Sequence, residues 1–330
     1  MAVEQLKQLW QLSFGDSPEY TDFYFSRAYN AENTVTRQAD GRIVSAAQFR
    51  HFDILCGQYI LRGVYILGVC THPDFRRKGL SAQIIEQILL EQARMGADLA
   101  FLIPSKEQLF DSYGRFGFGT VFTAWEEGVC ADAIKSSEGV SYRIIKPPME
   151  ELYKFYNDFY RSLEQAVLKD REYFMFAMDD LLAAGGRIDV CGFEGDICGF
   201  AATEGNVVKE LICLDVTARN TLLSVLLAAN AGAGLKVLTP GRGCAPSPFA
   251  VKKSMGMARV LNPCSFLEKT GKSFAPLHIA DRILPQNSGL YTVNEGRVSF
   301  SPAKDVSAAS DISRLPAMML DEPYANLLLN

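Results

Sequence analysis

Residues Gly68–Ser81 read GVCTHPDFRRKGLS, and this stretch decides how the first part of the chain folds. The overlapping run Val64–Cys70 is apolar and rich in residues that favour strands, so it predicts a buried strand. Residues His72–Asp74 include a proline that ends the strand, and Ala82–Met95 has the apolar periodicity of a helix. The stretch therefore predicts a strand, a basic turn that contains glycine, and the start of a helix.

The basic turn has the properties of a pyrophosphate site. A helix N-terminus presents unpaired backbone N–H groups and the positive end of the helix dipole, and both attract an anion. The turn adds three consecutive cations, and its small residues allow phosphates to approach the backbone closely. The alternative is a basic helix start that only contacts solvent. We predict that six residues bind a pyrophosphate: Arg76, Arg77, Lys78, Gly79, Leu80 and Ser81.

The composition is that of an ordinary globular protein. With 330 residues the chain has room for two or three domains, and 48% hydrophobic and 22% charged residues are typical values. The net charge of −5 argues against nucleic acid as the main partner. The N-terminus has an early acid, Glu4, and no long apolar core, and the most apolar region, Leu222–Leu238, reads as a buried helix followed by a strand. We therefore expect a cytoplasmic protein without a membrane partner.

The cysteines and histidines give no sign of a metal site. None of the eight cysteines forms a C-x-x-C pair, so we expect free thiols in a cytoplasmic protein. The three histidines, His51, His72 and His278, are far apart in the sequence. Because no cysteine and histidine spacing suits zinc, we expect no metal cofactor.

The first part of the chain predicts one α/β unit. Asp40 and Gly41 form a hairpin signal between its first two strands. The predicted helices are Val3–Phe14, Ser17–Tyr29, a helix from Leu80, and Lys106–Arg115. The predicted strands are Asn33–Arg37, Arg42–His51, Cys56–Leu67, the strand through Val69, Asp98–Ile103 and Thr120–Val129.

A second part follows the polar stretch Lys135–Val140, which reads as a linker. Its predicted helices are Pro147–Phe159, Arg171–Ala184 and Thr217–Ala231, and its predicted strands are Arg187–Val190, Ile197–Glu204, Val207–Leu214 and Lys236–Thr239. The segment Leu211–Pro240 corresponds to Val69–Pro104, but Val216–Asn220 replaces the basic turn. This indicates a degenerate duplication in which only the first copy keeps the phosphate site, and an unrelated α/β domain is the alternative.

From Pro263 onward the composition changes and predicts a small third unit. Its predicted strands are Asp281–Leu284, Gly289–Asn294 and Arg297–Ser301, with a turn at Asn294–Gly296. Its predicted helices are Ile312–Leu320 and Tyr324–Leu329.

The pattern Arg76-x-x-Gly79-x-Ser81 resembles motif A of the GNAT N-acetyltransferases, which is written R/Q-x-x-G-x-G/A. Ser81 departs from the last position, but it is small and keeps the backbone accessible. The phrase SYGRFGF at Ser112–Phe118, after a short predicted helix, looks like the corresponding end of the coenzyme A site in this superfamily.

A closer resemblance is to the enhanced-intracellular-survival subfamily, and it covers the whole chain in order. It is most specific over Thr71–Phe118, and Asp281–Gly289 looks like part of a sterol-carrier-like domain. The resemblance implies an α/β (α+β) fold of tandem GNAT domains, each with a mixed central sheet flanked by helices, and a homo-oligomer. The implied domains are a catalytic GNAT domain at 1–134, a degenerate second GNAT-like domain at 141–264 and a short sterol-carrier-like domain at 265–330.

The resemblance further implies acetyl-CoA as co-substrate and direct transfer in a ternary complex to a primary amine. The acceptor is a small molecule, such as a polyamine or an aminoglycoside, or a lysine side chain. Val69, Cys70 and Thr71 are expected to pair with pantetheine, and a backbone N–H there to form the oxyanion hole. No histidine is placed to activate Cys70, so we interpret it as a buried strand residue. The predicted cofactor-binding set also includes Ser105.

Tyr113 is the predicted general acid, because a tyrosine hydroxyl lies close enough in pKa to a thiol to protonate a departing thiolate. The alternative is an aromatic ring that only packs beside Phe110, Phe116 and Phe118.

The general base is predicted less directly than the general acid. Many acetyltransferases use a glutamate on the strand before motif A, but Tyr65–Cys70 contains no acid. The resemblance implies that the terminal carboxylate, here that of Asn330, serves as base, and a frayed terminus is the alternative. Glu126 and Glu127 are the substitutes.

Two other functions remain open from the sequence. A coenzyme A or acyl-CoA binding module that senses metabolites without turnover would keep the turn around Gly79 and would not need Tyr113. A third hypothesis makes the C-terminal unit a lipid-binding domain.

Overall fold

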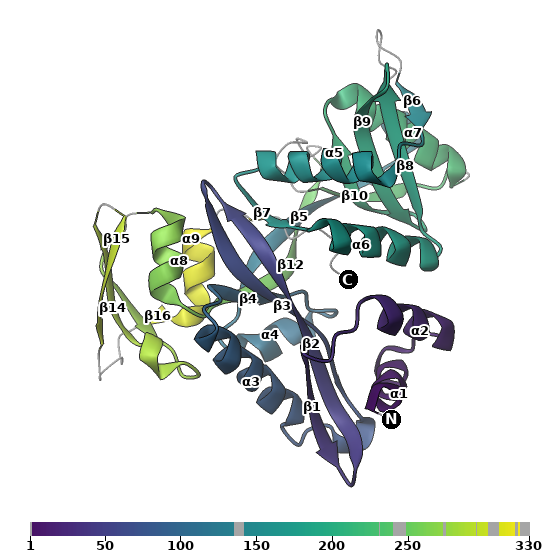
Figure 1. The fold of residues 1–330 in the computed structure, drawn as a ribbon. Coiled ribbons are helices and arrows are strands. Elements are labelled where there is room, and N and C mark those ends of the chain that lie inside the picture. The colour runs from purple at the N-terminus through teal and green to yellow at the C-terminus, as the bar shows by residue number, and fades with distance from the viewer. Residues whose placement is uncertain are drawn as a thin grey trace. The chain divides into compact units, whose positions relative to one another are not determined.

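The computed structural model describes residues 2–134, 142–230, 232–239, 249–272, 275–294, 296–302, 310–320 and 323 (Figure 1). The chain forms two compact units. Unit 1 comprises Met1–Phe122 and Gly256–Glu322, and unit 2 comprises Thr123–Met255 and Pro323–Asn330. The units group the chain differently from the three predicted segments, because Gly256–Glu322 groups with the N-terminal residues.

Unit 1 contains a mixed sheet in the order β1-β2-β3-β4-β12. Its strands are β1 (Thr34–Ala39), β2 (Arg42–Cys56), β3 (Tyr59–Thr71), β4 (Leu99–Leu102) and the last residues of β12 (Val251–Val260). Its helices in this part are α1 (Ala2–Phe14), α2 (Pro18–Arg27), α3 (Leu80–Arg94) and α4 (Gln108–Gly114). Strands β3 and β4 are parallel, and the other pairs are antiparallel.

Helix α3 connects β3 to β4 and packs on the sheet through its apolar stripe. Ile84, Ile88 and Leu89 are buried at helical spacing, and they form one cluster with Val64 and Ile66 of β3. In such a crossover the helix starts beside the C-terminal end of the first strand. The fold therefore brings the basic turn to the end of β3.

Unit 2 contains a second mixed sheet in the order β5-β11-β10-β9-β8-β6. Its strands are the last residues of β5 (Gly119–Val129), which begins in unit 1, and β6 (Arg143–Ile145), β8 (Arg187–Phe193), β9 (Asp196–Glu204), β10 (Val207–Cys213) and β11 (Leu235–Thr239), with β7 at Gln165–Leu168. Its helices are α5 (Met149–Ser162), α6 (Arg171–Ala183) and α7 (Val216–Ala229). Strands β10 and β11 are parallel and joined through α7, so this unit repeats the crossover of unit 1, as predicted.

The C-terminal segment of unit 1 has its own small sheet in the order β15-β14-β13-β16. Its elements are α8 (Pro263–Thr270), β13 (Leu277–Ala280), β14 (Gly289–Asn294), β15 (Arg297–Pro302), β16 (Ser310–Asp311) and α9 (Leu315–Met319). Short 3-10 turns lie at Pro285–Asn287 and Ile312–Arg314.

Several predictions about elements were wrong. The strands predicted at Cys56–Leu67 and through Val69 are a single strand, β3. The strand predicted at Asp281–Leu284 is a turn, because the Asp281 carboxylate accepts hydrogen bonds from the backbone N–H groups of Ile283 and Leu284, both at 3.0 Å. Among the described residues, six α-helices and strands had no prediction: β6, β7, β12, α8, β13 and β16.

Other predictions were confirmed or fall on parts that the structure does not describe. The region Leu222–Leu238 is the end of α7 followed by β11. The seven cysteines in the described residues are free thiols. The predicted linker Lys135–Val140 and the predicted helix Tyr324–Leu329 lie outside the described residues. Within those residues, every helix is too short or too polar to span a lipid bilayer.

Candidate functional site

A β-bulge shapes the end of β3. The register pairs Ala46 with Cys70 and Gln48 with Leu67, so Gly68 and the next residue stand opposite a single residue of β2. Gly68 has φ of +60°, and a Cβ atom there would lie 2.6 Å from the ring of Trp10. Both the backbone angle and the close ring require glycine at this position. The bulge redirects the last residues of β3, which are predicted to pair with pantetheine.

Strand β4 does not pair with the part of β3 that contains and follows the bulge. In the described chain, the β3–β4 ladder covers Gly63–Tyr65, and β3 continues to Thr71. Ser45 on β2 fixes this end, since its hydroxyl donates to the Cys70 carbonyl at 2.9 Å and lies 2.8 Å from the Thr71 hydroxyl. An extended ligand can therefore add along the unpaired edge of β3.

The turn between β3 and α3 has two residues in the left-handed region. Arg77 has φ of +62° and Gly79 has φ of +77°. The Arg76 side chain donates from Nε to the Thr71 carbonyl at 3.1 Å, and the Lys78 amine lies 4.5 Å from the ring centroid of Phe75. These contacts fix the side chains of two of the three cations, Arg76 and Lys78.

The N-terminus of α3 is open. Its N-cap is Gly79, which has no side chain to cap the helix, and the first helical bond runs from Gln83 N–H to the Gly79 carbonyl at 3.1 Å. The N–H groups of Leu80 and Ser81 precede that bond, so the helix offers them no acceptor. A Cβ atom on Gly79 would have no atom within 4 Å. An anion can reach these N–H groups.

The equivalent helix start in unit 2 is closed by a carboxylate. Asp215 is the N-cap of α7, and its side chain accepts from the Ala218 N–H at 2.8 Å. The Tyr142 hydroxyl donates to the other carboxylate oxygen at 2.5 Å, and this bond is the main reason that the pKa of Tyr142 is raised to about 12.

Tyr113 lies on α4 and packs into the core of unit 1. With Val69 it contacts the apolar cluster built on α3, and its ring meets Phe118 edge to face at 6.2 Å between centroids. Burial raises the pKa of the Tyr113 hydroxyl. Burial is the main cause that raises the pKa of Tyr65 on β3, and the hydroxyls of Tyr24 and Tyr113 raise it further.

The structure places several of the predicted site residues of unit 1 around helix α3 and the end of β3. Val69 and Tyr113 share a cluster with α3, whose open end carries Gly79. Ser105 is exposed in the loop after β4. Cys70 is a buried strand residue, as predicted, and burial raises the pKa of its thiol to about 11, which opposes a nucleophilic role.

The predicted bases lie elsewhere. Asn330 is outside the described residues. Glu126 and Glu127 belong to unit 2, where each forms an ion pair: Glu126 with Lys236 at 3.0 Å, and Glu127 with Arg219. Among the described side chains, no group of three histidine, cysteine, aspartate or glutamate residues is arranged to hold a metal ion.

Sequence reasoning missed three residues that shape this site: Gly68, Trp10 and Ser45. An isolated glycine within a strand pattern is a signal for a bulge, so Gly68 carried a usable sign. Trp10 and Ser45 carried no such sign. Their contacts depend on how α1 packs against β3 and how β2 pairs with β3.

Family and structure comparisons agree with this geometry. Residues 2–121, which lie in unit 1, match a family model described as acetyltransferase (GNAT) domain. Comparison with curated proteins finds no match. The first part of the chain is therefore similar to GNAT acetyltransferase domains, a class that supports acyl transfer in general.

Solved structures of similar fold cover nearly the whole chain. A conserved protein from Enterococcus faecalis, described as a probable N-acyltransferase, has a TM-score of 0.78 at 17% identity over 96% of this chain and 86% of that one. A GCN5-related N-acetyltransferase from Anabaena variabilis has 0.74 at 15% identity, over 96% and 87%. Eis1 from Mycobacterium abscessus has 0.70 at 14% identity, over 96% and 86%. These similarities show the predicted fold class, a mixed α+β fold with sheets flanked by helices.

Proposed function

We propose that the chain is an acetyl-CoA-dependent N-acetyltransferase that transfers the acetyl group directly to a primary amine. The observation that carries the proposal is the open N-terminus of α3. Gly79 leaves its N–H groups uncapped, and three cations precede it. The same unit contains the bulged end of β3 and the half-buried Tyr113.

In this proposal the cofactor lies along β3 and ends at α3. The pyrophosphate binds the turn Arg76–Ser81, mainly through backbone N–H groups. Pantetheine pairs with the unpaired edge of Val69–Thr71, and a backbone N–H there stabilises the oxyanion. Ser105 is the further cofactor contact.

The reaction needs one acid and one base. The amine nitrogen attacks the thioester carbon, the carbonyl oxygen takes up negative charge, and the carbon–sulfur bond then breaks. Tyr113 gives its proton to the leaving thiolate, because a tyrosine hydroxyl is protonated at neutral pH, and burial raises its pKa further. The resemblance assigns the proton of the amine to the terminal carboxylate of Asn330. Both substitutes, Glu126 and Glu127, are ion-paired.

The remaining assignments follow the resemblance to the enhanced-intracellular-survival subfamily. They are three domains: a catalytic GNAT domain at 1–134, a degenerate second GNAT-like domain at 141–264 and a short sterol-carrier-like domain at 265–330. They also include a homo-oligomer and a cytoplasmic location. The acceptor is a small cationic amine or a lysine side chain.

The test is acetyl transfer by the purified full chain, measured as release of free coenzyme A thiol. The acceptors are a polyamine, an aminoglycoside and a lysine-containing peptide. Tyr113→Phe should lower kcat about 100-fold, and its affinity for acetyl-CoA should stay the same. Tyr59→Phe, which removes an exposed hydroxyl at the far end of β3, is the control and should keep full activity.

The results separate the proposal from its alternative. Binding of acetyl-CoA without acetylation of any amine would identify a coenzyme A binding module. Full activity in Tyr113→Phe would remove Tyr113 as the acid.

A further inference from the structure

The C-terminal segment of unit 1 contacts the loop that follows Tyr113. Gly119 lies directly against the backbone of Ser313, so closely that a Cβ atom at Gly119 would overlap the Ser313 carbonyl. A Cβ atom at Gly117 would likewise overlap the guanidinium of Arg259 and lie 2.8 Å from a methyl group of Ile312. Gly117 has φ of +78°, which favours glycine. The absence of a Cβ atom leaves room for Arg259 and Ile312.

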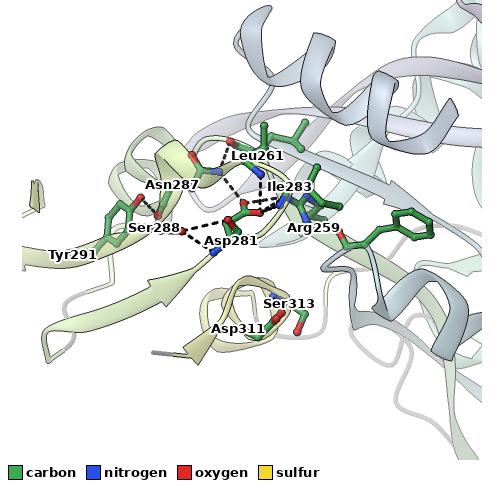
Figure 2. Close-up of polar contacts among 11 residues, drawn as sticks. Arg259, Leu261, Asp281, Ile283, Asn287, Ser288, Tyr291, Asp311 and Ser313 are labelled. Atoms are coloured by element: carbon green, nitrogen blue, oxygen red, sulfur yellow. Dashed lines mark hydrogen bonds and ion pairs between the residues drawn. The ribbon is translucent and has the colours of Figure 1, made fainter. Parts of the chain in front are cut away.

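Arg259 and Asp281 form a buried ion pair in this segment. Arg259 on β12 donates from one terminal nitrogen to both carboxylate oxygens of Asp281, at 2.7 and 2.9 Å. The side chains are 1% and 0% exposed. Figure 2 shows the Asp281 carboxylate facing the guanidinium from the turn that follows β13.

Hydrogen bonds fix both the carboxylate and the backbone N–H of Asp281. Its first oxygen accepts from the N–H groups of Ile283 and Leu284, and its second accepts from the Asn287 amide at 3.1 Å (Figure 2). Its own N–H donates to the Ser288 hydroxyl at 3.0 Å. The carboxylate therefore has a fixed position, and it fixes the guanidinium in turn.

The other terminal nitrogen of Arg259 reaches the Tyr113 loop. It donates to the carbonyl of Phe116, and the Phe116 N–H donates to the carbonyl of Tyr113 at 2.9 Å. Two hydrogen bonds thus connect Arg259 to the end of the helix that carries Tyr113.

This arrangement is poorly explained by stability alone. Burial of an ion pair removes both charges from water, and apolar residues of similar volume often stabilise a fold as well or better. Arg259 also leaves its Nε without a hydrogen-bond partner among the described atoms, which costs free energy. A pair kept at such a cost is expected where geometry matters more than stability.

We infer that Arg259 and Asp281 are positioning residues that hold the loop after Tyr113, and so set where the Tyr113 hydroxyl lies. The inference rests on the proposed function in one respect, which is the role of Tyr113 as acid. It gives the C-terminal segment a part in the catalytic site of unit 1.

A second ion pair in unit 1 offers a matched control. The Lys269 amine lies 2.6 Å from the Asp98 carboxylate, which is 0% exposed. Asp98 also accepts from the Ser265 hydroxyl at 2.6 Å and the Arg62 N–H at 2.7 Å. This pair ties α8 to the start of β4, as the first pair ties the C-terminal turn to the Tyr113 loop, but it does not include the loop.

The experiment compares Arg259→Met, Asp281→Asn and Lys269→Met in the full chain. Acetyl transfer gives kcat and KM, and the protein is labelled with 3-fluorotyrosine so that fluorine NMR reports the ring environment of Tyr113. The signal of Tyr113 is assigned by its loss in Tyr113→Phe. Arg259→Met and Asp281→Asn should lower kcat about tenfold, leave KM for acetyl-CoA within about twofold, and shift or broaden the Tyr113 signal. Lys269→Met should change neither kcat nor the signal.

Two outcomes would overturn the inference. One is an unchanged Tyr113 signal and kcat in Arg259→Met, and the other is an equal loss in Lys269→Met. If Arg259→Met does not fold, Arg259→Lys keeps the charge beside Asp281, loses the planar fork that reaches Phe116, and should give the same signature. The fluorine signal needs no turnover, so it tests the positioning even if no amine is acetylated.

Discussion

Two crossovers with the same topology differ at one place. In unit 1, β3, α3 and β4 form a parallel crossover, and in unit 2, β10, α7 and β11 form another. Helix α3 begins at Gly79 with no side-chain cap, after three cations. Helix α7 begins at Asp215, whose carboxylate accepts from the Ala218 N–H and from the Tyr142 hydroxyl.

The difference shows where the site lies in a repeated fold. A helix N-terminus favours a negative charge. In α7 the chain supplies that charge itself, and in α3 the charge has to come from a ligand. The crossover is a structural element in both units, whereas the capacity to bind an anion rests on a few residues at the helix start.

The two units also place their charges differently. The cations before α3 are exposed, whereas unit 2 buries Lys169 and Glu210. Burial lowers the pKa of Lys169 to about 7 and raises that of Glu210 to about 7. The hydroxyl of Tyr160 donates to Glu210. These two charged side chains belong to the core of unit 2.

The largest expected effect is on the stability of unit 2. Glu210→Gln removes the carboxylate whose charge raises the pKa of the buried Lys169 amine, and it should cost about 3 kcal/mol of unfolding free energy. Adding Lys169→Met should restore most of this loss. Chemical denaturation measures both, and equal stability of wild type and Glu210→Gln would contradict the prediction.

The same variant predicts a pH dependence with a definite sign. The pKa of Lys169 is lower in the folded than in the unfolded chain because of burial, so the unfolded chain binds more protons between the two values. Loss of the Glu210 charge lowers the pKa of Lys169 further, so the stability of Glu210→Gln should rise with pH through neutrality and up to about pH 9. The double variant with Lys169→Met lacks this group, and a rise of the same size there would refute the assignment.

The next effect is on the affinity of unit 1 for coenzyme A. Replacing Arg77 and Lys78 by glutamine should weaken binding about tenfold and reduce its dependence on salt, because two cations near the phosphates are lost. The control replaces the exposed Lys154 and Arg171 of unit 2 by glutamine, which changes the net charge equally. Equal weakening in both double variants would mean that the turn has no special role.

The smallest effect is the loss of the α7 cap. Asp215→Ala should lower the unfolding free energy by about 1 kcal/mol, since the Ala218 N–H loses its acceptor. Affinity for coenzyme A should not change. A gain of coenzyme A binding in unit 2 after this change would show that Asp215 alone separates the two crossovers.

The sequence predicted what local patterns encode. The basic turn follows a strand and opens a helix, and the hairpin at Asp40 and Gly41 has φ of +50° and +73°, as such a turn requires. The strand β12 was missed because its first residues, Val251–Ser254, are mostly polar, and its partner β4 lies some 150 residues earlier.

The supporting contacts of the site could not be predicted, because they depend on tertiary packing. The bond from Ser45 to the end of β3 depends on strand register. The bond from Arg259 to Phe116 joins residues 143 positions apart. An alternating pattern at Asp281–Leu284 predicted a strand, but one carboxylate that accepts from two backbone N–H groups turns the chain instead.

The most direct test of the central claim is calorimetric titration of coenzyme A into wild type, Gly79→Asn and Gly79→Asp. Asparagine and aspartate have the same shape and both tolerate the left-handed backbone of Gly79, so the two variants differ in one negative charge. We expect binding to weaken about tenfold in Gly79→Asn and at least about 100-fold in Gly79→Asp, where the chain supplies its own anion as unit 2 does. Equal affinity in both variants would contradict the claim that the start of α3 binds the pyrophosphate.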